Sequence, residues 1–139
     1  MVGRGVGMTV ASLPGTVPFA CQDDDGVVDH SVVVKRRAIR CALSRVCGVC
    51  GETLARPIAF LGPEDEALDG QFTFPPTHVA CAREALDRFT PFGDGVLGQP
   101  VAPRRWALVT TAGFDLVRPT RRGDPVRFHP NSTLSTTVI

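Results

Sequence analysis

The sequence CGVCG at residues 47–51 and the sequence HVAC at residues 78–81 decide how this chain folds. Each contains two metal-binding side chains that are separated by two residues, and 27 residues lie between Cys50 and His78. Thiolate and imidazole groups in sets of four are the ligands that Zn²⁺ prefers in a tetrahedral site. The two pairs therefore predict one zinc site, with the ligands Cys47, Cys50, His78 and Cys81.

The residues around both pairs suit metal binding. Gly48 and Gly51 make a tight turn sterically easy, so that backbone amides of the turn can reach the sulfurs. Cys81 lies in the first turn of a predicted helix, whose positive end favours the thiolate form. Three cysteines and one histidine leave no ligand position open, which predicts a structural rather than a catalytic ion. The alternatives are a metal-free, buried Cys81 or a thioredoxin-like redox pair, although that pair normally stands at the start of a helix.

Apolar periodicity indicates two helices. The first is expected over residues 31–46, with Asp29 or Ser31 as its N-cap. The second is expected over residues 79–89 and stops before Pro91. The predicted apolar stripe on the first helix is Ile39, Ala42, Leu43 and Val46, widened by Val34 and Ala38. On the second helix it is Ala82, Ala85, Leu86 and Phe89.

Short strands are expected between and after these helices, at residues 16–21, 26–29, 57–61, 106–111, 113–117 and 125–129. Ala112 and Gly113 supply a turn, which predicts a hairpin between the strands on either side. Residues 62–70 are acidic and are expected to form a loop.

These expectations define an α+β fold: a small treble-clef-like zinc module with two helices, short strands and a C-terminal β-hairpin. With 139 residues, 14 glycines and 12 prolines, the chain is loop-rich, and a bound ion would stabilise it. The expected organisation is a flexible N-terminus (1–15), a zinc-binding core (16–92), a hairpin packed on that core (93–130) and a flexible tail (131–139).

Composition limits the function and the location. The formal net charge of +1 disfavours strong non-specific nucleic-acid binding. No uninterrupted apolar run suits a signal peptide or a membrane helix. Five cysteines, an odd number, fit poorly with a disulfide framework, so we expect a cytoplasmic protein without a membrane partner. Cys21 and Cys41 are expected to be packed thiols, and His30 and His129 ordinary surface or loop residues.

Fourteen of the fifteen basic residues are arginines, and many gather before the first cysteine pair and near the C-terminus. They are interpreted either as solvated surface or as contacts to a partner. One Trp and no Tyr argue against a platform on which bases stack. A protein partner, or a role as an accessory subunit, is therefore favoured over nucleic acid, and no small-molecule substrate is expected. The candidate partner-binding residues are Arg36, Arg37, Arg40, Arg104, Arg105, Arg121 and Arg122.

An enzyme is the disfavoured alternative. A treble-clef nuclease would need a His general base and further ligands for its ion. Asp29-His30 is the nearest such pair, and it precedes the first cysteine pair without a matching downstream His. A cysteine nucleophile would need a His partner, and His78 is already used as a zinc ligand.

The motifs CGVCGETL (47–54) and FPPTHVACAR (74–83), followed by PF (91–92), resemble a family of small uncharacterised zinc-finger-like proteins from bacteriophages and bacterial genomes. VPFA (17–20) and RRAIR (36–40) are similar to that family's preceding segment. The resemblance implies that Cys47, Cys50, His78 and Cys81 bind zinc, and it implies no activity. Thr90 stands where the family often has a cysteine.

Overall fold

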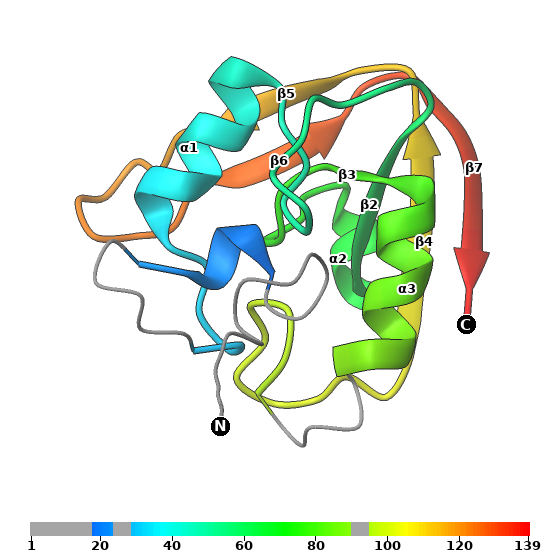
Figure 1. Ribbon diagram of the computed structural model, residues 1–139, viewed down its shortest axis with the longest axis horizontal. Helices are drawn as coiled ribbons and strands as arrows, with labels where there is room; N and C mark the ends of the chain where they lie inside the picture. Colours follow the sequence, from blue (N-terminus) through cyan, green and yellow to red (C-terminus); the bar gives the residue numbers. More distant parts are fainter. Residues whose placement is uncertain (1–17, 24–28, 90–94) are drawn as a thin grey trace, which may run out of the picture.

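The computed structural model describes residues 18–23, 29–89 and 95–139, and it shows the expected α+β mixture of helices and antiparallel strands (Figure 1). The elements in chain order are the 3₁₀-helix η2 (Phe19–Cys21), α1 (Lys35–Ser44), β2 (Ile58–Pro63), α2 (Glu64–Asp69), β3 (Thr77–His78), α3 (Val79–Phe89), β4 (Trp106–Thr111), β5 (Phe114–Val117), β6 (Arg127–Pro130) and β7 (Thr133–Val138).

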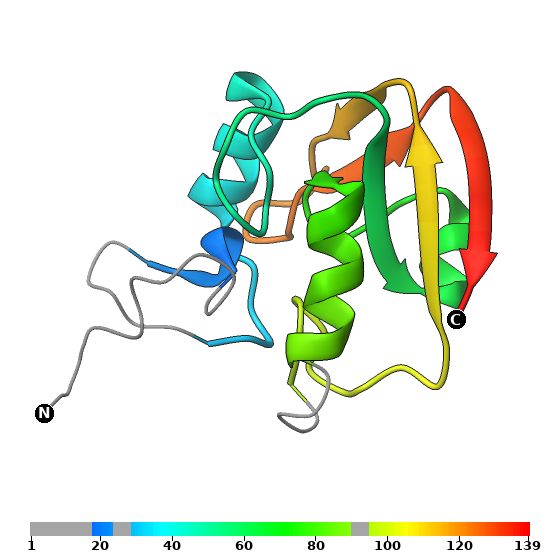
Figure 2. The same cartoon turned by 45° about the vertical axis from the view of Figure 1, so that its right-hand side comes forward.

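The strands form two antiparallel sheets. The larger sheet has the order β3-β2-β4-β7, and β5 pairs with β6 in the smaller one. Strands β2 and β4 pair along their whole length, from Ile58 opposite Thr111 to Pro63 opposite Trp106. In Figure 2, α3 lies against one face of the larger sheet. Helix α3 therefore covers only one of the two faces of the larger sheet.

Side chains that alternate along β2 and β4 enter two separate cores. Leu61 and its partner Leu108 belong to the core that contains α3 and the first cysteine pair. Phe60 and its partner Val109 belong to the opposite core, together with Phe72 and with residues of α1 and β6. Because both faces are covered, all six residues of β2 are buried, which explains why its sequence is continuously apolar.

The helix expected over 31–46 is shorter than predicted, and it has a different cap. It begins at Lys35 after Val34, which offers no side-chain cap. Asp29 instead accepts hydrogen bonds from the amide and the hydroxyl of Ser31, at 2.9 and 2.6 Å. The helix ends because Arg45 adopts a left-handed conformation with a φ of 54°.

The buried face of α1 agrees with the predicted stripe only in part. Ala38, Cys41 and Ala42 are buried, whereas Leu43 is 67 % exposed. Val46 lies beyond the end of the helix. Small residues face the core here because the helix packs closely against its neighbours, and the larger Leu43 lies outside that contact.

The acidic segment expected as a loop contains a helix, α2, so the described residues form one α-helix more than the two predicted. Glu64, Asp65 and Glu66 occupy its first turn, where negative charge stabilises the positive end of a helix. Gly70 ends the helix with a φ of 71°, a conformation that favours glycine. These three acidic residues therefore indicate the start of a helix rather than a loop.

The hairpin predicted between 106–111 and 113–117 is wrong, because β4 and β5 belong to different sheets. Ala112 and Gly113 mark the change of sheet, where they exchange backbone hydrogen bonds with Ser132 and Asn131. The expectation of antiparallel strand pairs near the C-terminus is nevertheless confirmed, because β5 pairs with β6 and β4 pairs with β7.

The tail expected to be flexible contains strand β7, which pairs with β4. At the other end, residues 18–21 contain η2 rather than the strand expected at 16–21. The expected flexible segment 1–15, most of the strand expected at 26–29, and Pro91 lie outside the described residues. Five expected elements are confirmed to within two residues, at 57–61, 79–89, 106–111, 113–117 and 125–129. No helix in the described part of the chain is long and apolar enough to cross a membrane.

Phe60 lies among three other aromatic rings, with ring centroids 5.5 Å from Phe72, 5.6 Å from Phe114 and 6.1 Å from Phe128. We expect Phe60→Ala to lower the free energy of unfolding by about 3–5 kcal/mol, because it removes a large buried side chain and leaves a cavity. Urea unfolding followed by circular dichroism measures this loss.

The matched control is Leu68→Ala, at a position that is 82 % exposed. That change should alter the free energy of unfolding by no more than about 0.5 kcal/mol. Equal effects of the two substitutions would contradict the assignment of Phe60 to a core.

Candidate metal centre

The four predicted ligands come together at one point. Sγ of Cys47, Cys50 and Cys81 and a ring nitrogen of His78 all lie within 4.8 Å of one another. Nδ1 of His78 is 3.4 Å from Sγ of Cys50 and 3.7 Å from Sγ of Cys81. In a tetrahedron with Zn–S bonds of about 2.3 Å and a Zn–N bond of about 2.0 Å, ligand atoms are about 3.5–3.8 Å apart. The cluster therefore has the dimensions to hold a metal ion.

A tight turn after α1 presents Cys47 and Cys50. An isolated bridge between Val46 and Thr53 closes this turn, and the amide of Cys47 donates to the carbonyl of Glu52 at 2.8 Å. Gly51 has a φ of 77°, and a Cβ on it would lie 2.9 Å from the ring of Phe19. Backbone conformation and packing thus both require glycine at position 51.

Strand β3 and the first turn of α3 present His78 and Cys81. His78 pairs with Ile58 of β2, and the buried hydroxyl of Thr77 donates to the carbonyl of Ala59 at 3.1 Å. The amide of Gly48 also donates to the carbonyl of Pro76 at 2.8 Å. These bonds fix the second ligand pair against the sheet and against the first.

A second hydrogen bond orients the ring of His78. Its Nε2 lies 2.8 Å from the carbonyl oxygen of Thr53. A carbonyl accepts only, so Nε2 must carry the proton, which leaves the lone pair of Nδ1 facing the sulfurs. Metal-binding histidines usually use their second nitrogen in this way. Because Thr53 also closes the turn of the first cysteine pair, that turn orients a ligand of the second pair.

Backbone amides converge on the sulfur of Cys47. Those of Val49, Cys50 and His78 donate to it at 3.3, 3.5 and 3.5 Å. Burial raises the pKa of Cys47, and these amides oppose that rise. Amides from both ligand segments therefore prepare this sulfur for the thiolate form.

The pKa of Cys81 is raised by burial and by the neighbouring sulfurs of Cys47 and Cys50. Three thiolates in one partly buried cluster repel one another unless a cation stands among them. A divalent ion that displaces the thiol protons removes this penalty, so the electrostatics favour occupation by a metal.

The other two cysteines are packed thiols, as predicted, and stand outside the cluster. Cys21 and Cys41 are both buried, and burial raises the pKa of each to about 12. The pair Asp29-His30, considered as part of a nuclease site, does not belong to the cluster either. Burial lowers the pKa of His30.

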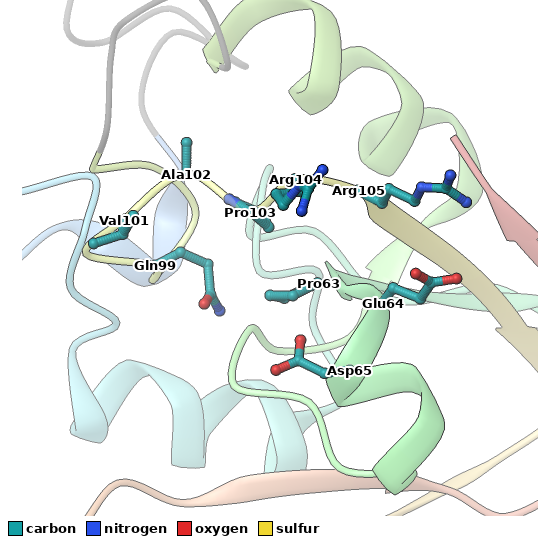
Figure 3. Close-up of a pocket in the computed structure, with 9 residues that line it drawn as sticks. All are labelled: Pro63, Glu64, Asp65, Gln99, Val101, Ala102, Pro103, Arg104 and Arg105. Atoms are coloured by element: carbon teal, nitrogen blue, oxygen red, sulfur yellow. The ribbon is translucent and has the colours of Figure 1, made fainter.

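The arginines proposed as partner contacts lie on three different parts of the chain. Arg36, Arg37 and Arg40 are on α1, while Arg121 and Arg122 are exposed between β5 and β6. Arg104 and Arg105 immediately precede β4 and line an open pocket of about 750 Å³. Figure 3 shows Glu64 and Asp65 of α2 on the other side of this pocket.

Two of these arginines contact their own chain, which sequence reasoning missed. Arg37 donates to the carbonyl of Phe19 at 3.3 Å, and its guanidinium lies 4.4 Å from the centre of the Phe19 ring. The guanidinium of Arg40 lies 5.6 Å from the same ring. Since this ring packs against Gly51, both side chains support the turn that carries Cys47 and Cys50. The signal in the sequence is the helical spacing of the two residues, which places them on one face of α1.

No family model, curated protein or solved structure matches this chain significantly. The resemblance of its two motifs to small phage and bacterial zinc-finger-like proteins, and the treble-clef interpretation, therefore stay predictions.

The hydrogen bond of His78 allows a sharp test of the ligand set. Nδ1 is the ring nitrogen nearer the backbone, so a cysteine at position 78 places its sulfur near the same point. We expect His78→Cys to retain zinc at one ion per chain. His78→Ala should weaken zinc binding by more than the roughly 10–100-fold that loss of an outer-shell contact causes.

Competition with a chromophoric chelator measures both affinities. His78→Ala protein that binds zinc as tightly as wild type would contradict the assignment of this side chain as a ligand.

Proposed function

We propose that the cluster holds one structural Zn²⁺ and that the protein is a non-enzymatic zinc module. The observation that carries this proposal is the convergence of four protein ligands from two distant segments. Three soft thiolates and an imidazole in tetrahedral arrangement favour zinc over the oxygen-seeking ions Mg²⁺ and Ca²⁺. Four protein ligands also leave no position for a catalytic water.

The ion would reinforce a contact between two segments that hydrogen bonds already join. It joins the turn after α1 to the junction of β3 and α3, and Cys47 is itself part of the core that α3 completes. Zinc binding in such sites contributes about 10–16 kcal/mol, and the net stability of a domain is about 5–15 kcal/mol. Folding of this half of the protein would therefore depend on the metal.

We further infer that the module acts by binding another protein, either as an adaptor or as an accessory subunit. The pocket beside β4 supports this role, because it sets Glu64 and Asp65 against Arg104 and Arg105. A polypeptide offers groups of both charges to such a surface, whereas the two carboxylates would repel a phosphate backbone. Five free cysteines suit a reducing compartment, so we assign the protein to the cytoplasm.

Removal of the ion tests the structural role. Purified protein should contain one zinc per chain, and a strong chelator should strongly reduce its helical circular dichroism and its melting temperature, because the ligands then lose their common centre. Cys50→Ser should show the same loss without chelator. A stripped protein whose dichroism and melting temperature are unchanged would refute a structural ion.

The interaction role is tested by affinity capture with zinc-loaded variants. The double variant Arg104→Glu/Arg105→Glu should lose the proteins that wild type retains, because it makes the pocket uniformly acidic. Arg56→Glu/Arg118→Glu, with the same charge change at exposed positions outside the candidate partner-binding residues, is the matched control and should keep them.

Capture that both double variants reduce equally would argue against the pocket. Metal-dependent DNA cleavage that His30→Ala abolishes would instead show that the protein is an enzyme.

A further inference from the structure

Strand β7 forms an edge of the larger sheet, and its six residues are all exposed. Figures 1 and 2 both show it as the outermost strand, with no described element beyond it. The opposite edge, β3, is only two residues long. An exposed edge strand is a template for another strand unless charges, prolines or bulges protect it.

The protection on β7 is weak. Residues 131–139 contain no charged side chain and no proline. A single register shift lies near the start of the strand, opposite Thr110 and Thr111. Threonine and valine dominate the sequence, and both favour strands. The edge from Ser135 onward is thus regular, neutral and ready to pair.

The hydrogen bonds between β7 and β4 show which backbone groups of β7 face outward. The amide of Ile139 donates to the carbonyl of Trp106 at 2.8 Å. In an antiparallel pair, backbone groups of alternate residues point to the same neighbour. Thr137 and Ser135 therefore also face β4, while the amides and carbonyls of Thr136 and Val138 point away from the sheet.

We propose that β7 pairs antiparallel with β7 of a second copy of this chain, about a two-fold axis at Thr136. The sequence Leu134-Ser135-Thr136-Thr137-Val138 is symmetric in chemistry about its centre: apolar, hydroxyl, hydroxyl, hydroxyl, apolar. In this register Thr136 lies opposite itself and Leu134 lies opposite Val138 of the other copy.

Three observations favour a second copy over a different strand. Leu134 and Val138 are 63 % and 44 % exposed, and the register brings these two apolar side chains together. Ser135 would lie opposite Thr137, and the sheet already makes such a hydroxyl contact, between Ser135 and Thr110 at 2.6 Å. A neutral strand also meets its own copy without repulsion between like charges. The product is one continuous sheet with four strands from each chain.

The test uses the full-length, zinc-loaded protein in sedimentation equilibrium over a range of concentrations. Wild type should approach twice the 14.8 kDa of one chain as concentration rises. Thr136→Lys and Thr136→Glu should each raise the dimer dissociation constant at least about tenfold, because like charges then face each other at the axis. An equimolar mixture of the two variants should dimerise again, because opposite charges now meet.

Leu68→Lys and Leu68→Glu, at an exposed position on α2, are the matched controls and should dimerise as wild type does. Zinc content and circular dichroism establish that each variant is folded.

A wild type that stays monomeric at every concentration overturns the proposal, and leaves the edge to a strand of a different protein or to another segment of this chain. A dimer that is indifferent to charge at position 136, or variants that do not dimerise on mixing, overturns it equally.

Discussion

Four side chains from two distant segments must reach one point, and this requirement organises the half of the protein that contains α3. Three hydrogen bonds hold the turn after α1 against the junction of β3 with α3. The amide of Gly48 donates to the carbonyl of Pro76, the ring of His78 donates to the carbonyl of Thr53, and the amide of His78 donates to the sulfur of Cys47. Each of these contacts crosses from one ligand segment to the other. The backbone and the proposed ion would therefore hold the same two segments together, so that each would lower the entropic cost of the other.

The remaining half is joined by a different kind of contact. Glu66 of α2 accepts from the amide and the hydroxyl of Thr73, and Arg127 of β6 donates to the same hydroxyl at 2.8 Å. This small polar network lies beside the aromatic core around Phe60 and connects α2 to the smaller sheet. Charged groups thus fix the ends of elements here, while aromatic rings fill the space between them.

Local patterns in the sequence were sufficient for features that depend on neighbouring residues. The ligand pairs, α3 and β4 follow from spacing and periodicity within short windows. Strand pairing was not accessible in this way, because Ala112-Gly113 fits a hairpin turn as well as a change of sheet. The polar sequence of β7 resembles a loose tail, and only its pairing with β4 makes it a strand. The exposure of Leu43 likewise depends on how closely α1 packs, which periodicity does not report.

Strand β2 is buried on both faces, and its residues alternate between the core beside the metal centre and the aromatic core. If β2 leaves its place, both cores lose packing contacts at the same time. The two halves are therefore coupled thermodynamically, so that they open as one cooperative unit rather than as independent subdomains. Loss of the proposed ion at one end of the molecule would then loosen the packing of aromatic side chains that do not contact it.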